Sequence, residues 1–247
     1  MIKVKSNKSL MNRFWRFLRK IILLFFVLSI FWVVLLRYIP IYFTPLMIIR
    51  TFESISEGEA SRNIKCWVPI NDISPNMVQA VVASEDNLFL EHSGFSFKDM
   101  QKAIEENKKG KSIRGGSTIS QQTAKNVFLW PQKSYIRKGL EAYFTVLIEF
   151  IWSKERIMEV YLNVIEMGKG VYGVEAASET YFNKPALKLT KYQAALIAAC
   201  LPNPRRFKVD NPSPYVLGRE IKIVSLMTKI NQIDFNSKVE SKKTKSR

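Results

Sequence analysis

The sequence predicts a mostly α-helical domain that follows a single N-terminal transmembrane helix. Three observations lead to this fold class. They are an uncharged apolar run near the N-terminus, a series of helix N-cap residues along the rest of the chain, and few stretches with the alternation of a strand. At 247 residues, 47% of them hydrophobic, the chain is long enough for one substantial domain and an extra segment.

The N-terminal segment is basic and the segment after it is apolar. Residues 1–20 contain seven Lys and Arg residues and no acid, whereas IILLFFVLSIFWVVLL at 21–36 carries no charge. Extended by its apolar flank, this run can cross a hydrocarbon core of about 30 Å. A cleaved signal peptide is the alternative, but the RYIPIY that follows lacks the small residues of a cleavage site. We expect an uncleaved anchor at 21–42, with residues 1–20 in the cytoplasm.

The net charge of +17 predicts a polyanionic partner: nucleic acid, an anionic membrane or a phosphate-bearing substrate. The apolar run favours the membrane, and we expect no nucleic acid. Cys66 and Cys200 are the only cysteines, and the sequence leaves open whether they pair. The apolar surroundings of Cys200 favour a buried free thiol. Two cysteines and one histidine do not make a metal framework.

The remaining elements follow from cap residues and periodicity. A connector is expected at 43–64, where 51–63 is polar, and a short strand or extended entry at 65–70. Residues 65–232 form the predicted helical domain, which contains a basic, glycine-marked loop at 107–116. The charged tail at 233–247 is expected to be disordered. The predicted helices run from a Ser74 cap to about 89, from a Ser117 cap onward, over 135–152, from a Ser153 cap towards 166, over 171–181, from a Thr190 cap to 201, and over 214–230.

Glu85 occupies an apolar face of the first of these domain helices. Val78, Val81 and Val82 precede it at helical spacing, and Phe89 follows four residues later. Asp86 lies one step round the same helix. Burial raises the pKa of a carboxyl group, which suits Glu85 to accept a proton near neutral pH. The alternative is a glutamate at a helix end that pairs with a lysine or faces solvent.

The segment RGGSTISQQTAKN at 114–126 has the features of an anion site. Two glycines allow a tight turn, and Ser117 is placed to cap the next helix. Thr118, Gln121 and Lys125 fall on one face of that helix. Together with Arg114 and the free N–H groups of the helix N-terminus, they favour a bound anion. The alternative is an ordinary capped surface helix; the segment is not a Walker P-loop.

On the next helix, Arg137 and Lys138 lie one turn before Glu141. A surface salt bridge of this kind contributes only about 0.3–0.5 kcal/mol, and that is one interpretation. The same side of the helix also carries apolar residues, so the face is not fully polar. The two cations would keep Glu141 ionised, in contrast to Glu85.

At this point the motifs show a resemblance. EDNLFLEHSG, GGSTISQQ, RKGLE and KERIMEVYLN, with VYGVEAASETYF and LPNPRRF after them, resemble the successive motifs of the peptidoglycan glycosyltransferase family. The match covers about residues 65–214 in order. Ser120 stands where the family commonly has Thr. Neither S-x-x-K nor K-T-G occurs, so the resemblance implies a monofunctional member without a penicillin-binding domain.

The resemblance implies a lysozyme-like domain that polymerises lipid II into β-1,4-linked glycan. Glu85 would be the general base on the acceptor 4-hydroxyl, whose attack releases undecaprenyl pyrophosphate with inversion. Glu141 would be the second essential acid, beside the donor pyrophosphate. Lys125 and Gln121 would contact phosphate and sugar, and Phe89 and His92 would shape the cleft. The remaining expected substrate-binding residues are Asp86, Arg114, Ser117, Thr118, Arg137 and Lys138.

The same resemblance places the enzyme in the bacterial inner membrane with its catalytic domain in the periplasm. The implied partners are lipid II, the growing glycan-lipid chain, membrane lipids and other cell-wall synthesis or division proteins. No cofactor is required. Mg²⁺ or Mn²⁺ at the pyrophosphate is compatible with the family, but no acid cluster in the sequence demands it.

Two other classes remain as alternatives. A cell-wall hydrolase would use the same carboxylates with water as nucleophile, but it needs neither an anchor nor a pyrophosphate site. A non-catalytic membrane scaffold would explain the anchor and the charge, but not the GGSTISQQTAKN segment.

The basic residues between the two main motifs predict a membrane contact. Lysines and an arginine alternate there with apolar residues, and each such cation is worth about 1 kcal/mol near an anionic leaflet. The alternative is a solvated loop whose charges serve only solubility. The residues concerned are Lys102, Lys108, Lys109, Lys111 and Arg114, interleaved with Phe95, Phe97, Met100 and Ile113.

Overall fold

The computed structural model describes residues 8–56, 58, 64–96, 101 and 116–235. The chain divides into two compact units, Met1–Ile39 and Pro40–Arg247. The predicted basic loop and most of the charged tail lie outside the described residues, as does Arg114.

The first unit contains one long helix, α1, at Lys8–Leu36. Its segment Met11–Leu36 contains an 18-residue window with a mean hydropathy of 2.4 and is long and apolar enough to cross a membrane. The helix therefore starts well before the anchor expected at 21–42, because the arginines at its beginning are compatible with a helix even though they are charged.

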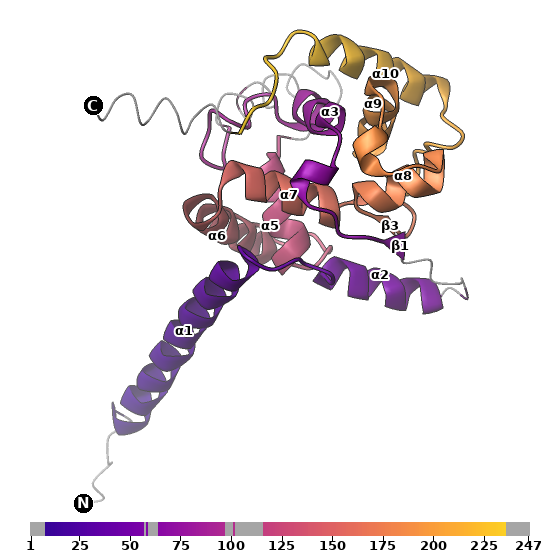
Figure 1. The fold of residues 1–247 in the computed structure, drawn as a ribbon. Coiled ribbons are helices and arrows are strands. Elements are labelled where there is room, and N and C mark those ends of the chain that lie inside the picture. The colour runs from indigo at the N-terminus through magenta and orange to yellow at the C-terminus, as the bar shows by residue number, and fades with distance from the viewer. Residues whose placement is uncertain (1–7, 57, 59–63, 97–100, 102–115, 236–247) are drawn as a thin grey trace, which may run out of the picture. The chain divides into compact units, whose positions relative to one another are not determined.

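The second unit is mostly helical, and its core surrounds helix α7 (Lys154–Val164). Ile157, Val160 and Leu162 of α7 are fully buried although they point in different directions, as expected for a central helix. Helix α5 (Ile119–Phe128) packs against both α7 and α6 (Tyr135–Ile151). Helix α3 (Pro75–Glu85) packs against α9 (Lys191–Cys200) and α10 (Pro214–Met227). Figure 1 shows these groups together with helix α8 (Val174–Phe182).

A small sheet completes the unit. Strand β3 (Val171–Tyr172) lies between β1 (Ile64–Lys65), to which it is parallel, and β2 (Glu166–Gly168), to which it is antiparallel. Two short 3₁₀ helices, Ile70–Asp72 and Ala186–Lys188, lie against each other.

Several predicted elements need correction. The connector expected at 43–64 contains a helix, α2 (Pro45–Ser56), because polar residues occupy only part of its circumference. Helix α3 ends at Glu85 rather than near 89, since Asp86 leaves the helical region with φ −162° and ψ 77°. The helix expected from 171 begins at Val174, after strand β3 and Gly173. The caps at Ser74, Ser153 and Thr190 are confirmed, because each side chain accepts a backbone N–H of the first turn.

Candidate active site

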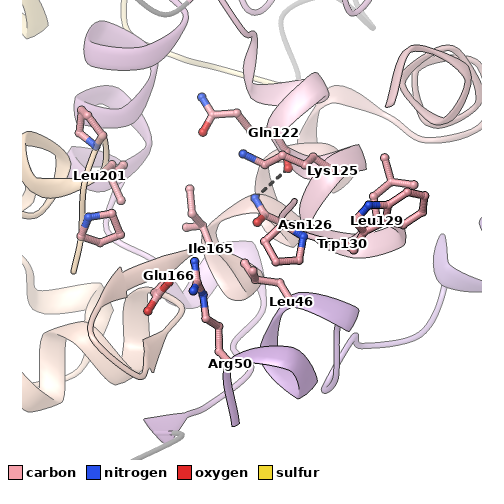
Figure 2. A pocket seen from close by; sticks show the side chains of 13 residues that line it. Leu46, Arg50, Gln122, Lys125, Asn126, Leu129, Trp130, Ile165, Glu166 and Leu201 are labelled. Carbon is pink, nitrogen blue, oxygen red and sulfur yellow. Dashed lines mark hydrogen bonds between the residues drawn. The ribbon is translucent and has the colours of Figure 1, made fainter. Parts of the chain in front are cut away.

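A cleft of about 250 Å³ lies between helices α2 and α5 and the segments that follow α7 and α9. In Figure 2, Gln122 and Lys125 project from α5 on one side, and Arg50 and Glu166 approach each other on the other side. Burial raises the pKa of Glu166, whereas the Gly170 N–H and Arg50 lower it. The lining residues are Leu46, Arg50, Gln122, Lys125, Asn126, Leu129, Trp130, Pro131, Ile165, Glu166, Leu201, Pro202 and Pro204.

Glu85 joins this cleft through a hydrogen bond. It is the last residue of α3, and its Oε2 accepts from Nε2 of Gln122 at 2.9 Å. Burial raises the pKa of Glu85. The Gln122 hydrogen bond, Arg219 and Lys125 all favour the ionised form, and Asp86 opposes it. A carboxylate with this balance accepts protons more readily than an ordinary glutamate.

Tyr161 of α7 holds the amide of Gln122 from its other end. The fully buried Tyr161 hydroxyl donates to Oε1 of Gln122 at 3.4 Å, which leaves Nε2 directed at Glu85. Burial raises the pKa of Tyr161 well above its usual value, and Glu85 and Asp86 add to this effect. The hydroxyl therefore stays protonated and available as a donor. The three side chains form a hydrogen-bonded row from the core to the acid.

Asp86 connects the end of α3 to the start of α5. Its Oδ2 accepts the backbone N–H of Ile119 at 3.0 Å, and its Oδ1 lies 2.8 Å from Nε2 of His92. Because Nδ1 of His92 accepts the N–H of Gly94, the ring proton is on Nε2 and is donated to Asp86. Asp86 is 5% exposed, so it fixes the position of α5 and is not open to a substrate.

The capping residue of α5 is Thr118, not Ser117 as the sequence predicted. Thr118 accepts from the N–H of Gln121, and Gln121 returns a bond to the N–H of Thr118, which completes a capping box. Thr118 also donates to the carbonyl of Gly94 at 2.7 Å. Ser117 is exposed, and Gln121 is buried in the box. The adjacent Gln122 lines the cleft and bonds to Glu85.

Phe89 lies in the turn after α3 and is fully buried, because the helix ends before it. Its ring contacts His92 edge-on, and Lys154 Nζ lies 4.5 Å from its centroid. Phe89 therefore packs in the core and does not line the cleft.

Glu141 lies in a cluster of cations. It is 3% exposed, and it accepts from Arg137 at 2.8 Å and from Lys138 at 2.5 Å. The buried Nε of Arg137 has no hydrogen-bond partner in the described part of the chain.

Lys125 connects the two acids. Burial lowers its pKa, while Glu141 and Glu85 raise the pKa and Arg137 and Lys138 lower it. Lys125 thus lies in the field of both carboxylates, and it lines the cleft. The structure brings together Glu85, Lys125, Arg137, Lys138 and Glu141, which lie on three different helices.

The arrangement fits an anion better than a metal ion. No group of three His, Cys, Asp or Glu side chains suited to a cation occurs among the described residues. Both oxygens of Glu141 already bind Arg137 and Lys138. Divalent cations of the Mg²⁺ type prefer oxygen ligands, which this cluster of donors does not supply.

Four residues of the site were not identified from the sequence: Gln122, Tyr161, Arg219 and Arg50. Gln122 could have been found, because it is the second glutamine of the GGSTISQQ motif. Arg219 donates to the carbonyl of Ala199 at 3.2 Å and acts on Glu85 from α10, far along the chain. No local pattern indicates such a contact.

The two cysteines are both free. Cys66 is exposed and Cys200 is buried. Burial raises the pKa of Cys200 to about 11, so its thiol is unreactive at neutral pH.

Comparison with known proteins gives consistent results. A family model described as Transglycosylase matches residues 51–244. A protein of Bdellovibrio bacteriovorus named biosynthetic peptidoglycan transglycosylase is 56% identical over 215 residues, which cover 85% of this chain and 86% of that protein. Proteins with the same name from Bacteroides thetaiotaomicron and Caulobacter vibrioides are each 54% identical. Each of those alignments covers 86% of this chain, with 86% and 93% of the respective relative.

Proposed function

The chain belongs to the transglycosylase family, and we propose that it is a membrane-anchored peptidoglycan glycosyltransferase that polymerises lipid II into β-1,4-linked glycan strands. The observation that carries the mechanism is the pairing of a desolvated acid, Glu85, with a buried lysine, Lys125, that is shared with a second acid. A base beside an anion-binding group suits a transfer in which one oxygen loses a proton and a pyrophosphate departs.

Glu85 removes the proton from the 4-hydroxyl of the acceptor sugar. The oxygen attacks the anomeric carbon of the growing chain as the bond from that carbon to the pyrophosphate oxygen breaks, so the configuration inverts. Gln122 donates to Oε2 of Glu85 and keeps one oxygen of the carboxylate oriented. General-base assistance of this kind contributes about 10²–10⁴-fold to the rate.

Lys125, Arg137 and Lys138 receive the developing charge of the pyrophosphate. Arg137 and Lys138 are held by Glu141, and Arg137 keeps an unpartnered Nε donor among the described residues. Hydrogen bonds from such cations to phosphate oxygens are roughly twice as strong as neutral ones. Glu141 acts by positioning these cations.

Helix α1 is the proposed anchor, with the N-terminus in the cytoplasm and the catalytic unit on the outer side of the inner membrane. The support is the apolar segment Met11–Leu36 and the excess of basic residues before it. This topology would give the catalytic unit access to lipid-linked substrate on the outer leaflet.

The test incubates the purified full-length protein, reconstituted in lipid, with labelled lipid II and separates the products by size. Glycan polymer of increasing length is the expected result. Shortening of preformed glycan without polymer would instead identify a hydrolase, and no change in either substrate would identify a non-catalytic scaffold.

A further inference from the structure

Helix α2 exposes its apolar side and turns its charged side towards the protein. Ile48, Phe52 and Ile55 follow one another at helical spacing and form one face, which we call the outer stripe. They are 48%, 68% and 60% exposed, respectively. A helix on a water-soluble surface has the opposite arrangement, with its apolar face against the core.

The inner side of α2 carries its charged residues together with Leu46 and Met47, and it contributes to the cleft. Arg50 and Glu53 form an ion pair at 2.5 Å, and their side chains are only 26% and 37% exposed. Leu46 and Arg50 line the cleft, and Met47 is buried at 4% exposure. The charged side of α2 thus faces the protein, and only the outer stripe is available to an outside partner.

The position of α2 in the chain identifies that partner. Eight residues separate the end of α1 at Leu36 from the start of α2 at Pro45. Such a chain reaches at most about 30 Å, so the proposed anchor keeps α2 near the bilayer surface. Two of the residues just before α2, Tyr42 and Phe43, are 54% and 73% exposed. Exposed aromatic residues beside a membrane span are typical of the membrane–water interface.

We infer that α2 lies in the membrane interface, with the outer stripe inserted at the boundary between head groups and acyl chains. The occupant of the stripe is lipid, because lipid is the one apolar phase that the chain itself holds within reach of α2. With α2 in that place, the wall formed by Leu46 and Arg50 opens at the membrane surface. This second statement rests on the proposed function, since it lets the sugar of a lipid-linked substrate enter the cleft while its prenyl chain stays in the bilayer.

The first test measures depth and does not depend on activity. The full-length protein with Cys66→Ser receives a single cysteine at Phe52 or, as control, at Asn71, an exposed polar position in a 3₁₀ helix. Both variants are labelled with an environment-sensitive fluorophore in vesicles of phosphatidylethanolamine and phosphatidylglycerol. We expect lipids that carry a spin label near the head group to quench the Phe52 label strongly, and aqueous iodide to quench the Asn71 label. Equal quenching of both labels by iodide would overturn the inference, because it would show that the stripe faces water.

The second test separates the membrane role from catalysis. Phe52→Glu with Ile55→Glu should lower polymerisation of full-length lipid II in vesicles several-fold. It should leave turnover of an analogue with a short, water-soluble prenyl chain close to that of the parent. An equal loss on both substrates would contradict the inference and point to a folding defect. Activity of the parent on neither substrate would count against the proposed function alone, because the fluorescence result would stand.

Discussion

At the scale of single residues, the charge of Glu85 depends on groups from three other parts of the fold. Gln122 and Lys125 act from α5, Arg219 acts from α10, and Asp86 opposes them from the next position in the chain. Tyr161 of α7 acts indirectly, through Gln122. Burial remains the largest effect, and it raises the pKa of the carboxyl group.

This balance predicts the pH dependence of both activity and stability. The base must be ionised, so kcat/KM should rise with pH along a limb whose midpoint lies above the usual glutamate value of about 4.3. A folded-state pKa that is raised stabilises the fold below the unfolded value and loses that contribution as pH rises through the folded value. Glu85→Gln should therefore gain thermal stability relative to the parent as pH rises over this window. Thermal melts between pH 4 and pH 8 test this, and a parent more stable than the variant at neutral pH would contradict it.

Tyr161 should act as a positioning residue. Without its hydroxyl the Gln122 amide can turn and present its oxygen, so Tyr161→Phe should lower kcat/KM about two- to tenfold, the worth of one net hydrogen bond. The acidic limb of the pH profile should move to higher pH, because the bond that favours ionised Glu85 is weakened. The pH–rate profile of polymerisation measures both effects.

Tyr172→Phe is the matched control for Tyr161→Phe. The Tyr172 hydroxyl is also buried but has no hydrogen-bond partner among the described residues. Its removal should leave the profile unchanged and the stability equal or higher. Similar shifts in both variants would show that the effect of Tyr161 is general loosening of the core.

Single residues also mark the limit of the sequence prediction. Glu85, Glu141 and Lys125 could be identified because each stands in a local pattern of charge and periodicity. Gln121 was expected to contact the substrate because it shares a helical stripe with Thr118 and Lys125. In the structure it is buried in the capping box of Thr118, and Gln122 is the residue that bonds to Glu85. The capping box could not be foreseen from the stripe, because Thr118 and Gln121 fall on one helical face whether they bind a ligand or each other.

At the scale of elements, the N-terminus of α5 is connected by hydrogen bonds to the segment that follows α3. It is bound by the capping box of Thr118, by Asp86 and by the carbonyl of Gly94. Helix α9 starts with a second capping box, formed by Thr190 and Gln193. The two boxes have the same local chemistry, but only the first belongs to a helix that lines the cleft.

This pair of caps gives a matched prediction. Thr118→Val and Thr190→Val should each lower the free energy of unfolding by about 0.5–2 kcal/mol, the usual effect of losing an N-cap. Only Thr118→Val should also lower kcat, because it releases the helix that carries Gln122 and Lys125. Denaturant unfolding and polymerisation rates measured on the same samples test this. Equal loss of kcat in both variants would show that stability alone controls the rate.

Most helices could be predicted from the sequence, because a capping residue and the helical turn that it caps are neighbours in the sequence. Helix α2 could not, since its apolar stripe faces outward and its polar residues are interrupted by apolar ones. The end of α3 was also wrong by one turn. Apolar residues continue to Phe89, but the chain leaves the helix so that Asp86 can accept the N–H of Ile119.

At the scale of the whole molecule, the fold brings the base Glu85 and the cations around Glu141 close to Lys125, from helices that are far apart in the chain. Lys125 carries this connection, because both Glu85 and Glu141 raise its pKa against the effect of burial. Helical periodicity and cap residues are local patterns, so they cannot predict that residues far apart in the sequence lie close together. Here only the family resemblance indicated this proximity.

Lys125→Ala should therefore weaken binding of the lipid II donor about ten- to hundredfold, because it removes a charge-assisted hydrogen bond to phosphate worth about 1.5–3 kcal/mol. Lys133→Ala is the control, since Lys133 is exposed and does not line the cleft. Binding of fluorescent lipid II to both variants in the same vesicles gives the comparison. Donor affinity that Lys125→Ala leaves unchanged would show that the anion site lies elsewhere.

The central claim is that Glu85 removes the proton in glycan polymerisation, and its most direct test is the rate of lipid II polymerisation by full-length Glu85→Gln in vesicles. The control is Glu220→Gln, because burial also raises the pKa of Glu220 but it has no role in the mechanism. The account predicts that Glu85→Gln loses about 10²–10⁴-fold in rate while its donor affinity is retained and its thermal stability is equal to or higher than that of the parent, and that Glu220→Gln polymerises like the parent. A folded Glu85→Gln protein that polymerises lipid II at a rate close to that of the parent would contradict the account.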